Sequence, residues 1–534
     1  MSETTSQLGG ASTSAWAPLR QPLFRALWIA SVTSNIGTWM QNVGAAWLMT
    51  LLTPSPTVVA LVQAATSLPV FLAALPAGAL ADVVDRRRLI LVTQGWMLLA
   101  AAGLGLLTIL GLTTPLILLA LTFALGLGAA MNGPAWQAIV AEVVPPAQLQ
   151  EAVALNAAGF NLARAVGPAL GGAIVAAAGP GPVFLLNAAS FVGVMFVVSR
   201  WQRAARASRL PAEHVLGAIR VGMRYVLHTP ALQAVLVRSG VFIVCGAALW
   251  ALLPLLARDQ LGLSAVGYGV LLGCLGAGAI TGAVLLPRIK RRVSLDALVA
   301  GATVCFAGVT LALAYVRDVY LVGAMMAPCG VAWMALMSSF NTAAQTSVPA
   351  WVRARALALY LLVFQGGTAV GSLLWGAVAA RVGIPAALVC AAVGLIAGFA
   401  VVTRYRLAGG EALDLSPSLH WPEPHVVVEP RPEDGPVLVL VEYLIQAERS
   451  HDFADAMHAL RGERLRDGAM RWGLFNDPAD PQRYVEAFLV ASWVEHLRQH
   501  ERVTSADRQA QEVARAFHIA GTPPMVSHLI HREW

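Results

Sequence analysis

Long apolar runs separated by short polar connections fill most of the first 405 residues. A transmembrane helix needs about 20 mainly apolar residues. Several runs exceed that length, which indicates tilt or extension into the membrane interface. In chain order the runs are 23–50, 57–81, 89–111, 115–141, 151–178, 182–199, 231–257, 265–287, 295–316, 319–345, 355–380 and 384–403. The pattern predicts twelve transmembrane helices in an all-α membrane protein.

The apolar runs form two copies of one six-helix unit, offset by 204 positions. In the stretches 78–88 and 282–292, an apolar run passes through a glycine and ends in three consecutive basic residues. The same offset pairs Gly126 with Gly330, Pro145 with Pro349, Leu155 with Leu359, Phe160 with Phe364, Gly167 with Gly371 and Gly172 with Gly376. Parallel repeats of this size are typical of transporters whose substrate path runs between two halves. We therefore expect six-helix bundles at 20–199 and 231–405.

Composition separates these bundles from the end of the chain. Of all residues, 57% are hydrophobic and 12% are charged, whereas a soluble protein carries about 25% charged residues. Residues 1–405 hold 23 basic and 9 acidic side chains, a net charge of +14, and residues 406–534 hold 13 and 20, a net charge of −7. The isoelectric point near 9.5 therefore reflects basic membrane connections, and we expect no nucleic-acid partner.

Basic residues also indicate which side of the membrane each connection faces. If the N-terminus is cytoplasmic, only Arg258, Arg317 and Arg381 lie in connections on the opposite side. The positive-inside rule then places both termini in the cytoplasm, and the polar tail 1–19 shows no removable signal peptide. Arginines scattered among apolar residues at 200–230 predict an interfacial helix that joins the halves. We expect a multi-pass protein of the cytoplasmic membrane, with the lipid bilayer as a partner.

The connection between the second and third helices carries Gly78-x-x-x-Asp82-x-x-Asp85-Arg86, followed by two more arginines. This stretch resembles the signature loop of the major facilitator superfamily, which usually has glycine where Asp85 stands. The resemblance implies that Gly78, Asp82 and Arg86 form a conformational latch between the second and eleventh helices, which holds the outward-facing state. The arginines would also fix topology without any latch, and both interpretations stay open.

The fifth helix carries Ala163-x-x-x-Gly167-Pro168-x-x-Gly171-Gly172. This motif resembles one associated with exporters of the same superfamily, with Ala163 in place of its first glycine. Small residues allow close helix packing, and proline removes an internal hydrogen bond and permits a kink. Simple packing is the alternative to an export-specific role.

Wider similarity at 34–40 and 161–164 points to the enterobactin-exporter-like branch, the transmembrane secretion effectors, over residues 20–405. The resemblance implies a secondary active transporter that exports an amphiphilic organic compound, such as a drug, siderophore or secondary metabolite, by alternating access. Proton antiport is the family default, but Thr38 stands where some relatives have aspartate, so the sequence does not identify a proton carrier. An importer of a small organic solute is the alternative within this class.

Arg164 is the most informative charge inside the apolar runs. It lies thirteen residues beyond Glu151, or roughly 20 Å along a helix. A charge at such depth costs on the order of 2.5–3.5 kcal/mol. No acidic residue lies deep in any run, so Arg164 should meet backbone carbonyls, amides such as Asn161, or an anionic group on the substrate.

Amides and large aromatic residues recur in the helices expected to surround the substrate path. Buried amides are costly unless paired, so such a set indicates either helix–helix hydrogen bonds or a wet cavity. The expected cavity residues are Asn35, Trp39, Gln41, Trp136, Gln137, Asn161, Arg164, Asn341, Gln345 and Gln365. They suit a small amphiphilic organic substrate better than an inorganic ion.

A proline-rich linker at 406–435 leads to a small domain at 436–534. Alternating and helical patterns predict a βαββαβ order, an α+β ferredoxin-like fold. This order resembles antibiotic-biosynthesis-monooxygenase domains, which often pair into dimers. The resemblance implies two alternatives, a homodimer through this domain and a membrane-anchored monooxygenase. No acid–base constellation stands out, and a dimerisation or regulatory module is favoured. His496 and His500 lie one helical turn apart on a polar helix, and we expect no catalytic residue, metal site or cofactor.

Overall fold

The computed structural model describes residues 14, 16–201, 223–407, 414–418, 420–422, 424 and 426–532. Residues 202–222 of the predicted interfacial helix at 200–230, and most of the tail 1–19, fall outside these residues, while 223–227 are helical. The chain forms two compact units, of which the first contains 1–212, 239–339 and 361–400, and the second 213–238, 340–360 and 401–534.

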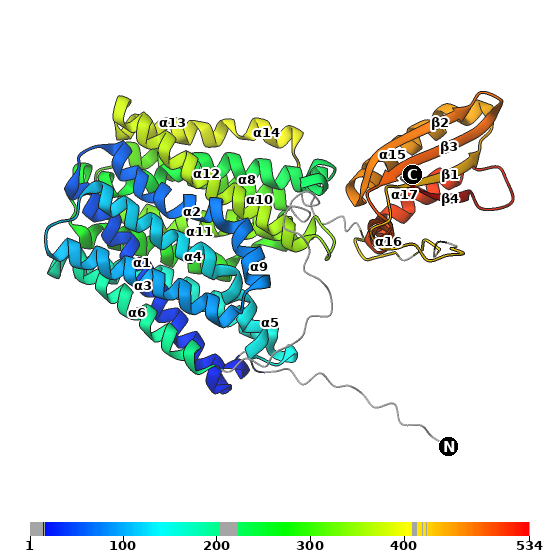
Figure 1. The fold of residues 1–534 in the computed structure, drawn as a ribbon. Helices are drawn as coiled ribbons and strands as arrows, with labels where there is room; N and C mark the ends of the chain where they lie inside the picture. Colours follow the sequence, from blue (N-terminus) through cyan, green and yellow to red (C-terminus); the bar gives the residue numbers. More distant parts are fainter. Residues whose placement is uncertain are drawn as a thin grey trace, which may run out of the picture. The chain divides into compact units, whose positions relative to one another are not determined.

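Six helices form the first half of the bundle, coloured blue to green-cyan (Figure 1). They are α1 (Pro22–Leu52), α2 (Pro56–Val83), α3 (Arg86–Ile109), α4 (Pro115–Val143), α5 (Leu149–Ala178) and α6 (Pro180–Arg200). Four begin at a proline, where the missing N–H has no helical partner to lose. Asp85 and Thr114 cap α3 and α4 by accepting hydrogen bonds from the backbone N–H groups of Arg88 (2.9 Å) and Ile117 (3.3 Å). Local sequence therefore sets where these helices start.

The second half repeats this arrangement. Its helices are α8 (Pro230–Leu255, continued by a π-turn at Leu256–Gln260), α9 (Ala265–Lys290), α10 (Leu295–Tyr315), α11 (Val319–Thr346), α12 (Arg353–Val382), α13 (Ile384–Ala397) and α14 (Phe399–Arg404). The last two, separated by Gly398 alone, together correspond to α6 of the first half. Gly179 (φ 81°) ends α5 and Gly383 (φ 85°) precedes α13. Glycine adopts this left-handed conformation without a Cβ penalty. The two turns are 204 positions apart, so the repeat extends to the backbone.

Helix packing follows the same repeat. A Cβ added at Gly126 on α4 would lie 3.1 Å from the carbonyl oxygen of Thr66 on α2, and one added at Gly330 on α11 would meet the carbonyl oxygen of Leu275 on α9. Both contacts need glycine because two helix backbones approach directly. The offset seen in the sequence therefore corresponds to equivalent helix pairs.

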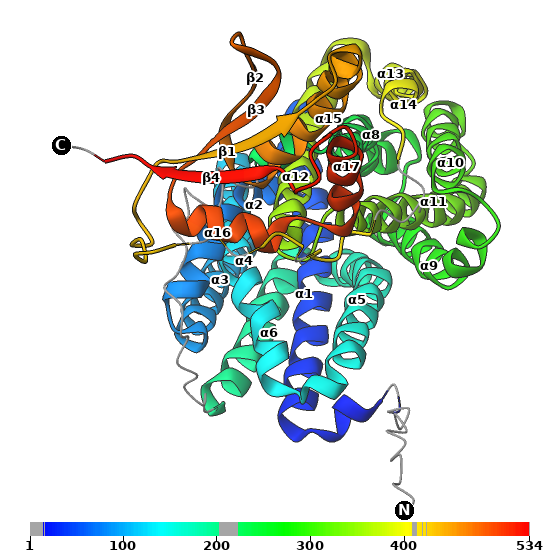
Figure 2. The same ribbon diagram turned by 90° about the vertical axis from the view of Figure 1, so that its right-hand side faces the viewer.

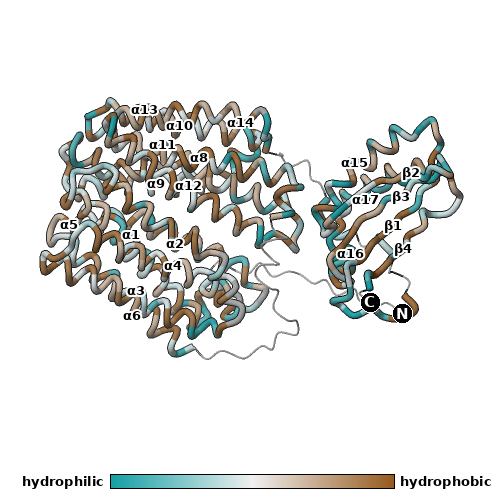
Figure 3. The backbone as a smooth tube through the Cα atoms, turned by 45° about the horizontal axis from the view of Figure 1, so that its top comes forward, coloured by the Kyte–Doolittle hydropathy of each residue, from teal (hydrophilic) through white to brown (hydrophobic). Residues whose placement is uncertain are grey.

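Most of these helices suit a membrane. Within the described residues, ten are long and apolar enough to cross one, while the 14-residue α13 is shorter. Figure 3 shows the bundle helices largely in the hydrophobic colour and much more hydrophilic colour on the C-terminal domain. The predicted fold class, an all-α membrane bundle of two six-helix halves with a small α+β domain, is confirmed.

The C-terminal domain has the predicted βαββαβ order. Its elements are β1 (Val437–Leu444), α15 (Ser450–Asp467), β2 (Ala469–Asp477), β3 (Asp480–Val490), α16 (Trp493–Arg502), α17 (Ser505–Arg515) and β4 (Met525–Ile530). The strands pair antiparallel in the order β2-β3-β1-β4, and lie side by side in Figure 2. Alternate residues of β1, such as Val439 and Val441, pack with Phe453 and Met457 of α15 in one core.

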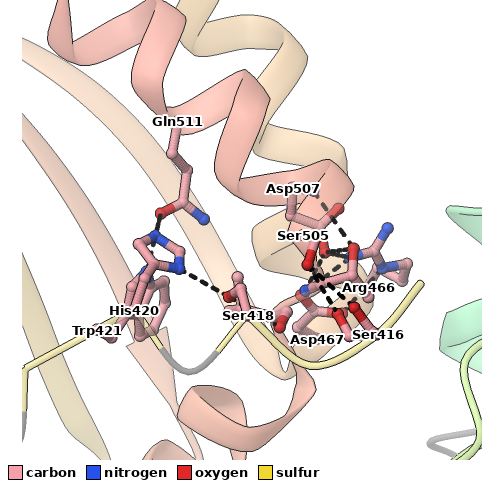
Figure 4. Close-up of polar contacts among 11 residues, drawn as sticks. Ser416, Ser418, His420, Trp421, Arg466, Asp467, Ser505, Asp507 and Gln511 are labelled. Carbon is pink, nitrogen blue, oxygen red and sulfur yellow. Dashed lines mark hydrogen bonds and ion pairs between the residues drawn. The ribbon is translucent and has the colours of Figure 1, made fainter. Parts of the chain in front are cut away.

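Part of the predicted linker is attached to this domain (Figure 4). The backbone N–H of Ser418 donates to the carbonyl of Val503 (2.9 Å). Trp421 Nε1 donates to Gln511 Oε1 (2.8 Å) on α17, and His420 Nε2 lies 3.1 Å from the same oxygen. The described linker residues between 414 and 421 therefore follow the domain surface.

Candidate functional site

Two glycine contacts, related by the 204-residue offset, join the two halves near one end of the bundle. A Cβ added at Gly172 on α5 would lie 2.5 Å from the carbonyl oxygen of Ala265 at the start of α9. One added at Gly376 on α12 would lie 3.2 Å from the carbonyl oxygen of Pro56 at the start of α2. Both contacts lie about two helical turns from the Gly179 and Gly383 turns. We call this the Gly179 end of the bundle, and there the halves touch backbone to backbone.

The glycines of the helix-five motif pack against two different helices. A Cβ at Gly167 would lie 2.6 Å from Trp39 Cβ, and one at Gly171 would lie 2.8 Å from Met40 Cα, so both fit α5 against α1 in the same half. Pro168 lies between them, and its carbonyl faces Gly269 on α9. Of these four residues, only Gly172 has its Cα packed directly against the backbone of the other half, at Ala265 and Gly269.

A cavity of about 490 Å³ lies inside the first half. Its lining is mostly amides, hydroxyls and aromatic rings, with a few valines. The lining residues are Ser31, Ser34, Asn35, Gln94, Asn132, Trp136, Gln137, Val140, Val153, Asn156, Phe160 and Val194. Of the expected cavity residues, Asn35, Trp136 and Gln137 are among them. The buried Gln94 has no hydrogen-bond partner for its Oε1 atom among the described residues, which suits a wet cavity.

Arg164 lies beside this cavity, in a cluster of aromatic rings. Its Cζ atom is 5.8 Å from the ring centroid of Trp39 on α1, 5.9 Å from that of Trp250 on α8 and 5.8 Å from that of Trp333 on α11. Phe160, a cavity residue, contacts Trp39 edge to face at 6.3 Å. The cluster therefore joins the cavity of the first half to two helices of the second.

The sequence did not single out Trp250 or Gln94. Gln94 is a lone amide in an apolar run, which was a usable signal. Trp250 lies in a continuous apolar run and is paired by the 204-residue offset with an alanine, Ala46. The sequence therefore offered no specific signal for it.

The other expected cavity residues lie elsewhere. Gln41 is buried and accepts a hydrogen bond from Asn187 Nδ2 on α6 (2.5 Å), so it ties two helices of one half together. Asn161 donates to the carbonyl of Ala157 in its own helix (3.0 Å). Gln345 donates to Asn341 (2.6 Å) near the end of α11.

Asn341 lies eight residues beyond Trp333 on α11, or roughly 12 Å along the helix, and Gln345 lies about one turn further. Gln365 on α12 directly follows Phe364, whose ring lies 6.2 Å from that of Trp333.

The signature loop is anchored within the first half. Arg86 Nη1 lies 2.5 Å from Glu142 Oε1 at the end of α4, and Arg87 Nε donates to the carbonyl of Val198 on α6 (3.2 Å). A Cβ added at Gly78 would meet no heavy atom of the described residues within 4 Å. The side chain of Asp82 lies outside the described part of the chain.

One group of buried polar side chains in the C-terminal domain is mutually satisfied. Arg464 donates from Nε and Nη2 to the two carboxylate oxygens of Glu486 (2.9 and 3.2 Å), and Trp472 Nε1 also donates to Oε1 (2.9 Å). Burial lowers the pKa of His496 to about 3 and that of His500 to about 4, so both are neutral bases at ordinary pH. Among the described residues, no group of three or more His, Cys, Asp or Glu side chains is arranged to hold a metal ion.

The family model described as transmembrane secretion effector matches residues 13–534. The chain belongs to this family. The match runs through the C-terminal domain, so that domain falls within the region the family model covers. The secretion-effector chain is accordingly a multi-pass membrane transporter of the major facilitator superfamily, and the expectation of a transporter rather than an enzyme is confirmed.

Relatives of this secretion effector are exporters by name. The multidrug efflux pump Tap of Mycolicibacterium fortuitum is 26% identical over 380 residues, covering 69% of this chain and 91% of Tap. The enterobactin exporter EntS of Citrobacter koseri is 26% identical over 387 residues, covering 71% of this chain and 89% of EntS. The predicted superfamily and branch are confirmed, while the resemblance of the C-terminal domain to monooxygenases is not.

Solved transporters share the fold of the secretion effector. A bacterial homologue of the human lysosomal transporter Spinster, inward-facing and unoccupied, superposes with a TM-score of 0.60 at 15% identity, covering 72% of this chain and 96% of that one. A point mutant of the nucleoside transporter NupG superposes with a TM-score of 0.58 at 12% identity, covering 72% and 100%. Nothing in these comparisons supports a homodimer through the C-terminal domain.

Proposed function

We propose that this transporter exports an amphiphilic organic compound from the cytoplasm across the cytoplasmic membrane. The observation that carries the proposal is the cavity of about 490 Å³, whose amides and aromatic rings offer both hydrogen bonds and apolar contact. An inorganic ion would find no carboxylate among its lining residues. The names of Tap and EntS, a multidrug efflux pump and an exporter, support the outward direction.

Alternating access is the mechanism we propose. With both termini in the cytoplasm, as the arginine distribution indicates, the Gly179 end faces outward. The contacts of Gly172 with Ala265 and of Gly376 with Pro56 then close the outer side. Export requires these two contacts to separate while the halves close at the opposite end.

The latch proposed for Gly78, Asp82 and Arg86 belongs to that opposite end. The open space around Gly78 is consistent with a latch that is not engaged while the outer side is closed. Asp82→Asn and Gly78→Leu should then slow turnover more than they reduce membrane insertion. Gly193→Ala on α6 is the matched control, because a Cβ there also meets no heavy atom within 4 Å. Normal transport in both latch variants at normal expression would remove this role.

Proton antiport is the coupling we propose, as in the family in general. The described helices offer no carboxylate deep in the bundle, since the acidic residues Glu142, Glu151, Asp296 and Asp318 lie at or near helix ends. The test is dye accumulation in inverted vesicles with an imposed pH gradient, with and without a protonophore. Transport that is unaffected by collapse of the gradient would exclude proton drive.

The direction is tested with the same vesicles. Inverted vesicles should accumulate fluorescent drugs or siderophores from a panel, and vesicles lacking the protein give the background. Accumulation confined to right-side-out vesicles would instead establish an importer.

A further inference from the structure

Arg164 has no hydrogen-bond acceptor within the described part of the bundle. Its Nε atom is buried without a partner, and the contacts of its guanidinium group are the faces of Trp39, Trp250 and Trp333 at 5.8–5.9 Å. Indole faces attract a cation but accept no strong hydrogen bond. The five N–H donors of the guanidinium therefore exceed what this protein environment offers.

A second buried donor lies at the same place. Trp250 Nε1 is buried and has no acceptor among the described residues. By contrast, the indole N–H groups of Trp28, Trp96 and Trp375 donate to backbone carbonyls at 2.7–2.9 Å. Two unpartnered N–H donors on different halves thus converge on one cluster, and an unmet buried donor is costly unless a ligand or water satisfies it.

The residues of this cluster also depart from the internal repeat. The 204-residue offset pairs Trp39 with Ile243, Arg164 with Thr368, Trp250 with Ala46 and Trp333 with Ala129. The surrounding pair Phe160 and Phe364 is kept, and each ring contacts a tryptophan of the cluster at 6.2–6.3 Å. The scaffold is therefore symmetric, whereas the charged aromatic cluster occurs once.

We propose that Arg164 and the Trp250 indole N–H form a subsite for the carboxylate of an aromatic organic acid. The guanidinium supplies charge and hydrogen bonds, and the rings of Trp39, Trp333 and Phe364 contact the flat apolar part of the ligand. The carboxylate neutralises a cation that has no protein counter-ion in the described bundle. The inference rests on the proposed function, because it names a substrate class for the exporter.

The location gives this subsite a place in transport. Trp39 and Arg164 come from α1 and α5, and Trp250, Trp333 and Phe364 come from α8, α11 and α12. A ligand held here touches both halves, so its binding energy can differ between the two conformations. The amide-lined cavity next to Phe160 holds the remaining polar part of the compound.

Binding of 1-naphthoate and of the neutral isostere 1-naphthamide to the purified full-length protein, measured by titration calorimetry, tests the proposal. The wild type should bind the naphthoate at least 10-fold more tightly. Arg164→Ala should abolish that preference, and Arg164→Lys should retain part of it, since charge remains but the planar fork is lost. Trp250→Phe, which keeps a ring but removes the N–H, should weaken naphthoate binding by 3- to 10-fold.

Trp96→Phe is the matched control, because its N–H already donates to Ala124 (2.7 Å). It should leave both affinities unchanged. Equal binding of the two probes by the wild type, binding of neither, or an unchanged preference in Arg164→Ala would overturn the subsite. Arg164→Lys keeps the test decisive if Arg164→Ala does not fold. If wild-type vesicles export dye but the purified protein does not prefer naphthoate over naphthamide, the subsite is refuted and the proposed export function is not.

Discussion

Replacing Gly172 by alanine should open the Gly179 end of the bundle. The added Cβ would lie 2.5 Å from the carbonyl oxygen of Ala265 and 3.1 Å from Gly269 Cα. Both atoms belong to the backbone of α9, so no side-chain rotation can relieve the clash. Ordinary contact begins near 3.4 Å, and α5 and α9 would have to separate by about 1 Å.

The cost falls on the closed outer side alone. Overpacking of this kind costs about 1–3 kcal/mol, and the conformation in which α5 and α9 are apart does not bear it. A bias of that size shifts a two-state equilibrium by about 5- to 150-fold. Gly376→Ala should shift it less, because the nearest backbone oxygen, that of Pro56, would lie 3.2 Å from the added Cβ rather than 2.5 Å, although the Ala60 Cβ at 2.6 Å must also move.

The assay is the labelling rate of Ala265→Cys by a membrane-impermeant maleimide on intact cells, in a chain whose five native cysteines are replaced. Ala265 is 3% exposed, so labelling should be slow until the contact opens. Gly172→Ala should raise the rate most, Gly376→Ala less, and the control Gly193→Ala not at all. If labelling in Gly172→Ala matched the control at equal expression, the glycine contact would not be what closes this end.

Other predictions concern the loop and the C-terminal domain. Arg86→Ala should slow turnover in vesicles about as much as Asp82→Asn, because Arg86 belongs to the proposed latch. Its partly exposed pair with Glu142 contributes only about 0–1 kcal/mol, so a merely slight loss would leave Arg86 an anchoring role and remove it from the latch. Arg464→Ala leaves the fully buried Glu486 without its counter-charge and should destabilise the domain by about 3–5 kcal/mol. Thermal proteolysis of that domain in the full chain would measure the loss, and unchanged proteolysis would refute it. The pKa of His496 is about 3 in the folded chain against about 6.5 unfolded, so the unfolded state binds more protons between these values. Domain stability should therefore fall as pH drops from about 6.5 to about 4, and His496→Gln should flatten that slope.

The sequence by itself determined the helices, the two halves and the domain order. The lengths of the apolar runs and the 204-residue offset are properties of the chain in one dimension. The apolar run at 437–444 and the every-second-residue pattern at 484–490 likewise predicted two of the strands. These features need no knowledge of neighbours, because membrane thickness and strand pleat impose them locally.

Only the tertiary structure decided which residues meet. Gln41 was predicted to line the cavity, yet its side chain accepts a hydrogen bond from Asn187, 146 positions away, inside the bundle. Gly172 and Gly171 are adjacent in one motif, but they face α9 and α1 respectively. Helical periodicity says which face a residue occupies, whereas the helix opposite that face is chosen by the packing of all the helices together. For the same reason Arg164 was a recognisable charge in the sequence, while its three indole neighbours, drawn from α1, α8 and α11, became visible only in the fold.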